Sequence, residues 1–139
     1  MGEGEGGPEP PRDAIAAWAE RARALGPTWD GTPDDPVLEA CGAGPLGPAG
    51  KAPFRAPEVG RGAAPTPAAR VYTAGALAHL RLTSAAPHHG DSAAAVVVAQ
   101  LLEPPANLAR VRAHLGAEAA RLVEHALAPD PDRRPSLPA

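Results

Sequence analysis

The run from Ala68 to Thr83 is apolar or small around almost the whole of a helical surface, and it limits what this chain can fold into. Thr66 supplies a side-chain oxygen at the N-cap position, and Pro67 suits the first turn, where its missing N–H has no partner to lose. A helix without a polar face is typical of one that is buried on all sides. Gly75 costs about 1 kcal/mol relative to alanine inside a helix, so we expect a neighbouring element to approach it closely. The sequence therefore predicts a mainly α fold, built round a buried central helix over 68–83.

Three further helices are expected around this one, over 13–25, 92–102 and 117–128. Each has a capping residue or an apolar stripe at helical spacing, and Gly or Pro at its end. Asp91 or Ser92 is a suitable N-cap for the second of them. The residues expected to face the core are Ile15, Trp18, Ala22 and Leu25 in the first helix, Ala94, Val97, Val98 and Leu101 in the second, and Ala119, Leu122, Val123, Ala126 and Leu127 in the third.

The remaining segments read as connections and tails. Asn107 to Leu115 is expected to be a connector, and Gly26 to Ala49 the least ordered part of the domain. Residues 1–11 are expected to form a disordered acidic tail rich in Gly and Pro, 12–136 a single domain, and 137–139 a short tail. The core must be thin, because fewer than a fifth of the residues are Leu, Ile, Val or Phe. In the run Val96-Val97-Val98, at least one valine should lie outside the packed stripe and leave a small apolar spot.

The charge balance narrows the possible partners and location. A net charge of −3 argues against a nucleic-acid interface, and no apolar run approaches the roughly 20 residues of a membrane span. We expect no signal peptide in the acidic N-terminal stretch, and the single cysteine excludes an internal disulfide. Together these features predict a cytoplasmic protein. A single lysine beside twelve arginines, with abundant Ala, Gly and Pro, is typical of a high-GC bacterial genome.

Several short patterns could suggest a catalytic, cofactor or metal site, but each has a simpler explanation. The adjacent His88 and His89, with Asp91, are expected to form a solvated loop, because adjacent residues rarely point at one ion. The Gly-rich run at 44–51 is out of register for a phosphate-binding loop, and Cys41 has no base near it in the sequence. The solvated face of the last helix is expected to hold His114, Glu118, Arg121 and His125. We therefore predict no catalytic residue, no cofactor site and no metal site.

Four short motifs, taken in order, resemble the C-lobe of bacterial Ser/Thr protein kinases. The stretch Gly50-Lys51-Ala52-Pro53-Phe54-Arg55-Ala56-Pro57-Glu58 is similar to the end of the activation segment, which closes on A-P-E. Further on, Arg70 to Gly75 resembles the start of the central helix, Leu82 to Pro87 its exit, and Asp130 to Ser136 the D-P-x-x-R-P-S run that closes the lobe. The resemblance spans residues 50–136 and implies a truncated kinase-C-lobe-like domain. It also implies that Glu58 and Arg134 form a buried ion pair.

The same resemblance indicates that the catalytic parts are missing. No histidine precedes His79, so the H-R-D catalytic loop is absent from its expected place. If Val37 to Gly42 is laid on the strand and turn that carry D-F-G, then Ala40 replaces the metal-binding Asp and Cys41 the Phe, with Gly42 retained. Arg70 replaces the Asp that caps the catalytic loop in this family, a change that fits a chain with no loop to cap. Lys51 and Ala52 stand where an activation segment often has a Thr.

These observations favour a non-catalytic, pseudokinase-like module with a regulatory or protein-interaction role. Its expected partner is a protein, such as a kinase or a separate N-lobe. By the resemblance, the helix over 92–102 corresponds to a kinase helix that is commonly a docking surface for partners. The alternatives are half of a split or mis-started Ser/Thr kinase, a non-functional gene remnant, or an unrelated small helical adaptor. The ordered spacing of the four motifs argues against the last.

Overall fold

The computed structural model describes residues 30–135, and its regular structure is helical. No strand occurs within this range, so the mainly α fold is confirmed. The expected helix at 13–25 and the tails at 1–11 and 137–139 lie outside the described residues. The α-helices are α2 (Asp35–Ala40), α3 (Pro57–Gly60), α4 (Pro67–Thr83), α5 (Ala93–Leu102), α6 (Leu108–Leu115) and α7 (Ala117–Ala126), and the 3-10 turns are η1 (Ala52–Phe54) and η2 (Pro131–Arg133).

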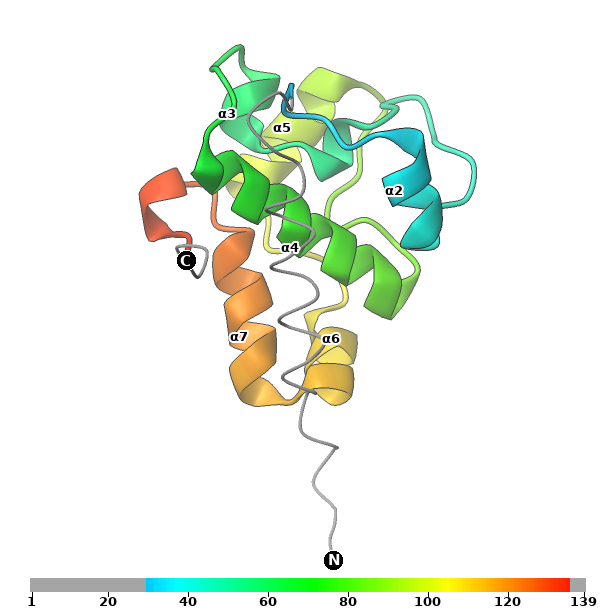
Figure 1. Cartoon of the computed structure of the whole chain (residues 1–139), viewed down its shortest axis with the longest axis vertical. Coiled ribbons are helices and arrows are strands. Elements are labelled where there is room, and N and C mark those ends of the chain that lie inside the picture. Colours follow the sequence, from blue (N-terminus) through cyan, green and yellow to red (C-terminus); the bar gives the residue numbers. More distant parts are fainter. Residues whose placement is uncertain (1–29, 136–139) are drawn as a thin grey trace, which may run out of the picture.

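Helix α4 runs through the middle of the fold, as the sequence predicted (Figure 1). It begins where Thr66 caps it, because the Thr66 hydroxyl accepts a hydrogen bond from the Ala69 N–H at 3.2 Å. It ends before Ser84, whose φ of 63° is left-handed and stops the helix. Most of its side chains are buried, since α4 packs against α6, α7, η1 and η2. The predicted buried central helix is confirmed.

The close approach expected at Gly75 is made by α7. A Cβ atom added at Gly75 would lie 2.9 Å from the Cβ of Ala126 and 3.3 Å from side-chain atoms of Leu127. A contact of 2.9 Å is shorter than real Cβ atoms allow, so glycine is what lets the two helices touch. The core-facing residues of α7 are Ala120, Val123 and Ala126, with Leu122 half-buried, and Leu127 directly after the helix is also buried. Three of the five residues predicted for this face are therefore fully buried.

Helix α5 forms at the expected place but turns a different face inward. Ser92 caps it by accepting the Ala95 N–H at 3.1 Å. The buried residues are Val96, Ala99 and Gln100. Of the predicted inner face, Ala94, Val98 and Leu101 are exposed and only Val97 is half-buried, next to Gly60 of α3, so the predicted face is mostly wrong. The helix is apolar at nearly every position, and such a sequence has no periodicity to select a face. Its partners α3 and η1 select it instead.

Residues 107–115, expected to be a connector, contain the eight-residue helix α6. Asn107 precedes it with a left-handed φ of 59°, and Gly116, at φ 83°, makes the sharp turn into α7. Val111 is fully buried, because α6 packs against both α4 and α7. A helix this short is marginal in isolation, so packing against its neighbours is what stabilises it.

Residues 35–40 form α2, so the stretch that can be laid on the D-F-G strand and turn of the kinase family is helical here up to Ala40. A strand must pair its backbone groups with a neighbouring strand, whereas a helix satisfies them within itself. Since residues 30–135 contain no strand to pair with, the helix is the available solution. The segment is also better packed than expected for the least ordered part, because Leu38 and Cys41 join the hydrophobic core.

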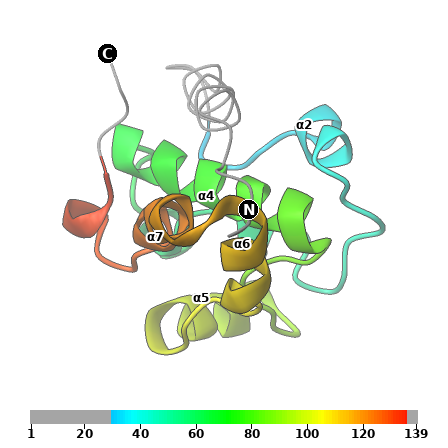
Figure 2. The ribbon, with the colours of Figure 1, turned by 90° about the horizontal axis from the view of Figure 1, so that it is seen from below.

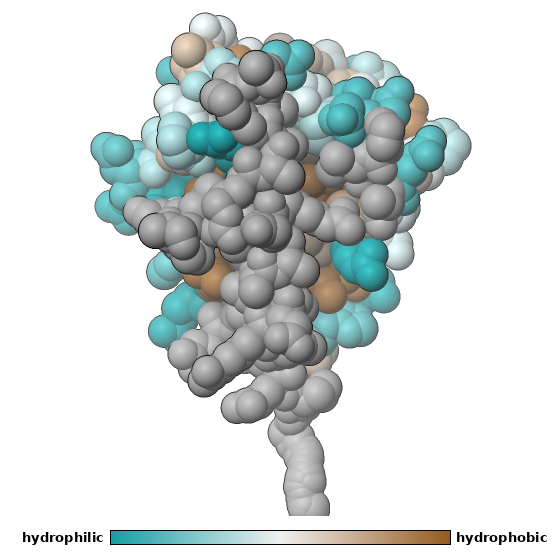
Figure 3. All heavy atoms as spheres, viewed as in Figure 1, coloured by the Kyte–Doolittle hydropathy of each residue, from teal (hydrophilic) through white to brown (hydrophobic). Residues whose placement is uncertain are grey.

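The surface follows the usual division of polar and apolar side chains. On the face shown in Figure 3, hydrophilic residues dominate the edge and apolar atoms appear toward the middle. None of the helices formed by the described residues is long and apolar enough to cross a membrane.

Candidate functional site

A buried polar site surrounds Arg134, directly after η2. Its carboxylate partner is Glu58 in α3, a helix that starts at Pro57 and is preceded by the fully buried Ala56. Proline suits this first turn, and its placement brings Glu58 into the first turn of α3, where the helix dipole favours an acidic side chain. In sequence the two charged residues are 76 positions apart.

Every N–H group of the Arg134 guanidinium has an acceptor. Nη1 donates to Glu58 Oε2 at 2.7 Å and Nη2 donates to Glu58 Oε1 at 2.8 Å, which is the bidentate arrangement. The other donors reach backbone carbonyls: Nη1 to Ala68 at 3.1 Å, Nη2 to Pro129 at 3.3 Å and Nε to Ala128 at 2.8 Å. We call these five residues the Arg134 cluster. It ties together α3, the start of α4 and the segment after α7.

The Arg134 cluster is a structural device, because its charges are buried and matched. The Arg134 side chain is 0% exposed and the Glu58 side chain 20%. The guanidinium carbon also lies 5.0 Å from the centre of the Tyr72 ring, a favourable cation–π distance. Burial raises the pKa of Tyr72, so the phenol stays neutral.

The remaining motif residues do not gather round Arg134. Ala40 is the last residue of α2, Cys41 is buried after it, and Gly42 makes an exposed turn at φ 93°. In both views of the ribbon, α2 lies on the opposite side of the molecule from η2 (Figures 1 and 2). Arg70 is half-buried near the start of α4. The structure thus brings together Ala56, Pro57, Glu58 and Arg134 and leaves residues 40–42 elsewhere.

The histidine loop after α4 is more deeply packed than predicted. His88 is buried, and its Nε2 lies 3.0 Å from the carbonyl oxygen of Glu103. Burial lowers the pKa of His88. The expectation of a solvated loop therefore fails for His88, although His89 and Asp91 are exposed. The reason is tertiary, since the C-terminal end of α5 returns across the loop and supplies the carbonyl partner.

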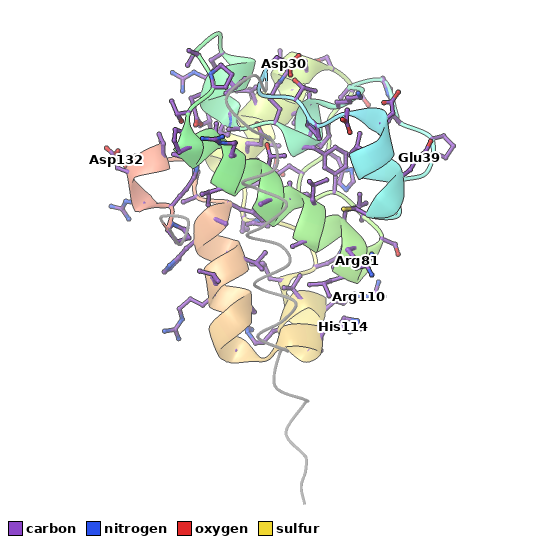
Figure 4. The ribbon with its side chains drawn as sticks, in the orientation of Figure 1. Asp30, Glu39, Arg81, Arg110, His114 and Asp132 are labelled. Atoms are coloured by element: carbon purple, nitrogen blue, oxygen red, sulfur yellow. The ribbon has the colours of Figure 1, made fainter. Side chains whose placement is uncertain are left out.

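Among residues 30–135 there is no group of three or more His, Cys, Asp or Glu side chains that could hold a metal ion. On α6 and α7, His114, Arg121 and His125 are exposed. Figure 4 shows Arg110 and His114 on α6 at the same end of the molecule as Arg81 of α4.

Among the described residues, four buried polar side chains were not predicted from the sequence. These are Thr73, His79 and Thr83 on α4 and Gln100 on α5. The Gln100 side-chain amide donates to the carbonyl oxygen of Arg55 at 2.9 Å, which fixes α5 to the segment after η1. A signal was present for the α4 pair, since His79 and Thr83 are four residues apart in an otherwise apolar helix and so share a face.

An apolar surface is exposed on the side of α5 away from its packing partners. Val98 is 54% exposed, Leu101 39% and Leu102 78%. With the exposed Ala94 and Ala95 they form a stripe that we call the outer face of α5. The apolar spot predicted from the valine run is confirmed at Val98. Helix α5 lies at one edge of the molecule (Figure 2) and contains no charged residue.

Comparison with known proteins does not assign the chain to a family. No protein-family model matches it, and no curated protein matches it either. The function of the chain is therefore inferred from its residues and their geometry.

Proposed function

We propose that the chain is a non-catalytic, protein-kinase-like module with a helical C-lobe scaffold and a regulatory or protein-interaction role. The pairing of Glu58 with Arg134 carries this proposal. In protein kinases the glutamate of A-P-E pairs with the arginine of the closing R-P-S run, and here residues in those two motifs meet across 76 positions. The resemblance predicts this contact, whereas no local rule joins residues that far apart in the sequence.

Two further features support the proposal. The central helix is buried along its length, and Gly75, which belongs to the second motif, is the point where α7 touches it. Ala40 occupies the position where the resemblance expects a metal-binding aspartate, and alanine supplies no oxygen for Mg²⁺. The scaffold contacts are kept while the catalytic residues are replaced.

The outer face of α5 is the surface proposed for a protein partner. An exposed apolar stripe adds no stability to the isolated domain, and such patches mark interaction sites in soluble proteins. In this proposal the partner is a protein, such as a kinase or a separate N-lobe, and the module acts in the cytoplasm without binding nucleic acid.

Phosphotransfer and nucleotide binding test the non-catalytic assignment. The purified full chain is incubated with Mg-ATP and a general protein substrate, beside an active Ser/Thr kinase as positive control, and its thermal unfolding is followed with and without millimolar Mg-ATP. We expect no phosphate incorporation and no change in Tm. A nucleotide at 100 times its Kd would add about 2.7 kcal/mol and raise Tm by several degrees.

The same measurements separate the alternatives. Phosphate transfer by the chain would overturn the proposal in favour of a kinase, and transfer only after addition of a separate N-lobe would favour half of a split enzyme. A broad, non-cooperative melt would favour a gene remnant.

In-cell photocrosslinking tests the interaction surface. A photoreactive amino acid placed at Leu102 is expected to give a discrete adduct with a protein, and the adduct should be lost when Val98→Glu is added. The control site is Arg133 on η2, whose side chain is 82% exposed. Equal labelling from both sites would show that α5 has no special role.

A further inference from the structure

The outer face of α5 carries its small and its large side chains at opposite ends. Ala94 and Ala95 lie on the first turn, Val98 lies in the middle, and Leu101 and Leu102 lie on the last turn. All five are exposed, and they recur at the intervals of three and four residues that let a second helix pack along a stripe. Because a helix rises about 1.5 Å per residue, the stripe is about 12 Å long.

A second copy of α5 fits this stripe when the two helices run antiparallel about a twofold axis at Val98. Positions equally far before and after Val98 then lie at the same height along the pair. The two leucines of one copy therefore pack against the two alanines of the other. Each large side chain faces a small one, which is the condition for close packing without voids. In a parallel pair, leucines would meet leucines and the alanine ends would leave a gap.

The charges of this segment favour the same arrangement. Helix α5 contains no charged residue, so no like charges meet where a twofold axis brings identical side chains together. Glu103, the exposed residue directly after α5, lies at the height of Ala93 in the second copy, where the N-terminal end of that helix favours a carboxylate. Asp91 is exposed and lies beyond the stripe, where water and salt screen its charge.

We propose that the outer face of α5 binds a second copy of this chain, with the two α5 helices antiparallel and Val98 on the twofold axis. This inference rests on the proposed interaction role of that face and names its partner. Helix α5 lies at one edge of the molecule, where a second copy can approach it (Figure 2). A standard interface buries about 800 Å² on each partner, more than one ten-residue helix offers. We therefore expect a weak, reversible dimer with a Kd on the order of 0.1–1 mM.

Sedimentation equilibrium of the full chain, from about 10 µM to about 1 mM, tests the association. The chain has a mass of 14.0 kDa, and we expect the average mass to rise toward twice this value with concentration. Leu46, which is 41% exposed in the segment before η1, provides the control, because Leu46→Glu should associate like the wild type. A wild type that stays at 14.0 kDa throughout would overturn the proposal.

Charges placed on the proposed axis test the arrangement. Val98→Glu and Val98→Lys should each raise the Kd by at least about tenfold, because two like charges meet at the axis. Mixing the two variants brings opposite charges together and should restore association. Thermal unfolding checks that each variant is folded, and if one is not, the concentration dependence of the wild-type mass decides. An equimolar mixture of folded variants that stays monomeric would contradict the twofold arrangement.

The same two substitutions at Leu102 control for the orientation of the helices. In the antiparallel pair the two copies of this position lie about 12 Å apart along the helix axes, so mixing Leu102→Glu with Leu102→Lys should not restore association. Restoration at this position as well as at Val98 would indicate a parallel pair and overturn the antiparallel one.

The photocrosslink at Leu102 separates failure of this inference from failure of the proposed function. If a second copy is the partner, the adduct has twice the mass of the chain and contains only this sequence. An adduct with a different protein, together with a monomeric wild type, would overturn the inference and keep the interaction role. A monomeric wild type that gives no adduct would contradict both.

Discussion

Around Arg134, every N–H group of a buried cation has an acceptor, whereas along the outer face of α5 apolar side chains reach solvent. The first region holds three parts of the chain in place, and almost any change there leaves a buried charge or carbonyl unmatched. The second contributes little to the isolated fold. Because substitutions on this apolar surface should change the stability of the domain very little, it is the best place to look for contact with a partner. The Arg134 cluster therefore stabilises the fold, whereas the outer face of α5 is a surface that the fold exposes to solvent.

The largest effect is expected when the Arg134 cluster is broken from one side. Replacing Arg134 by Met leaves the Glu58 carboxylate and three backbone carbonyls without their donor, which should cost about 3–5 kcal/mol of unfolding free energy. Chemical denaturation measures this. Arg133→Met is the matched control, because the neighbouring side chain is exposed and its change should stay within about 0.5 kcal/mol. Equal effects for the two variants would contradict the assignment of the cluster as the main anchor.

A smaller loss is expected at the contact between α4 and α7. Gly75→Ala gains about 1 kcal/mol of helix propensity but pushes its Cβ to 2.9 Å from Ala126, so we expect a net loss of about 1–3 kcal/mol. Gly44→Ala serves as control, since an added Cβ there meets nothing within 4 Å. A Gly75→Ala protein more stable than wild type would show that α7 can move away without cost.

His88 should make stability depend on pH below neutrality. Because burial lowers its pKa, the ring stays neutral in the folded protein while the unfolded chain takes up a proton below about pH 6.5. The stability it contributes is therefore present above that pH and is lost as the pH falls toward the lowered folded value. Denaturation at a series of pH values should show this loss in the wild type and in His89→Gln, and a weaker one in His88→Gln. An unchanged profile in His88→Gln would assign the acid sensitivity to other groups.

The smallest change in unfolding free energy is expected for substitutions on the outer face of α5. A substitution on the buried face of the same helix provides the contrast. Leu102→Ser should change the unfolding free energy by no more than about 0.5 kcal/mol. Val96→Ala, on the buried side of the same helix, should cost about 2 kcal/mol for the lost burial and the cavity. Similar losses for both variants would mean that the outer face is covered within this chain.

The ends of the main helices were determined by the sequence itself. Thr66 and Pro67 start α4, and Ser92 starts α5, because a capping oxygen and a preset φ act on backbone groups within a turn. The apolar content of residues 68–83 likewise required a buried helix whatever surrounded it. The ion pair between Glu58 and Arg134 followed from motif resemblance, since no local rule joins residues that far apart.

Only the tertiary structure decided which face of α5 is buried, that residues 108–115 are helical, and that residues 35–40 are helix and not strand. In each case the local signal was weak: α5 is apolar on all sides, α6 is short, and a strand would have needed a partner. The same holds for His79, His88 and Gln100, whose backbone acceptors are residues 106, 103 and 55. A polar side chain can be buried in the core when a backbone carbonyl from a distant part of the chain accepts its hydrogen bond. Only the packed tertiary structure brings the two groups together.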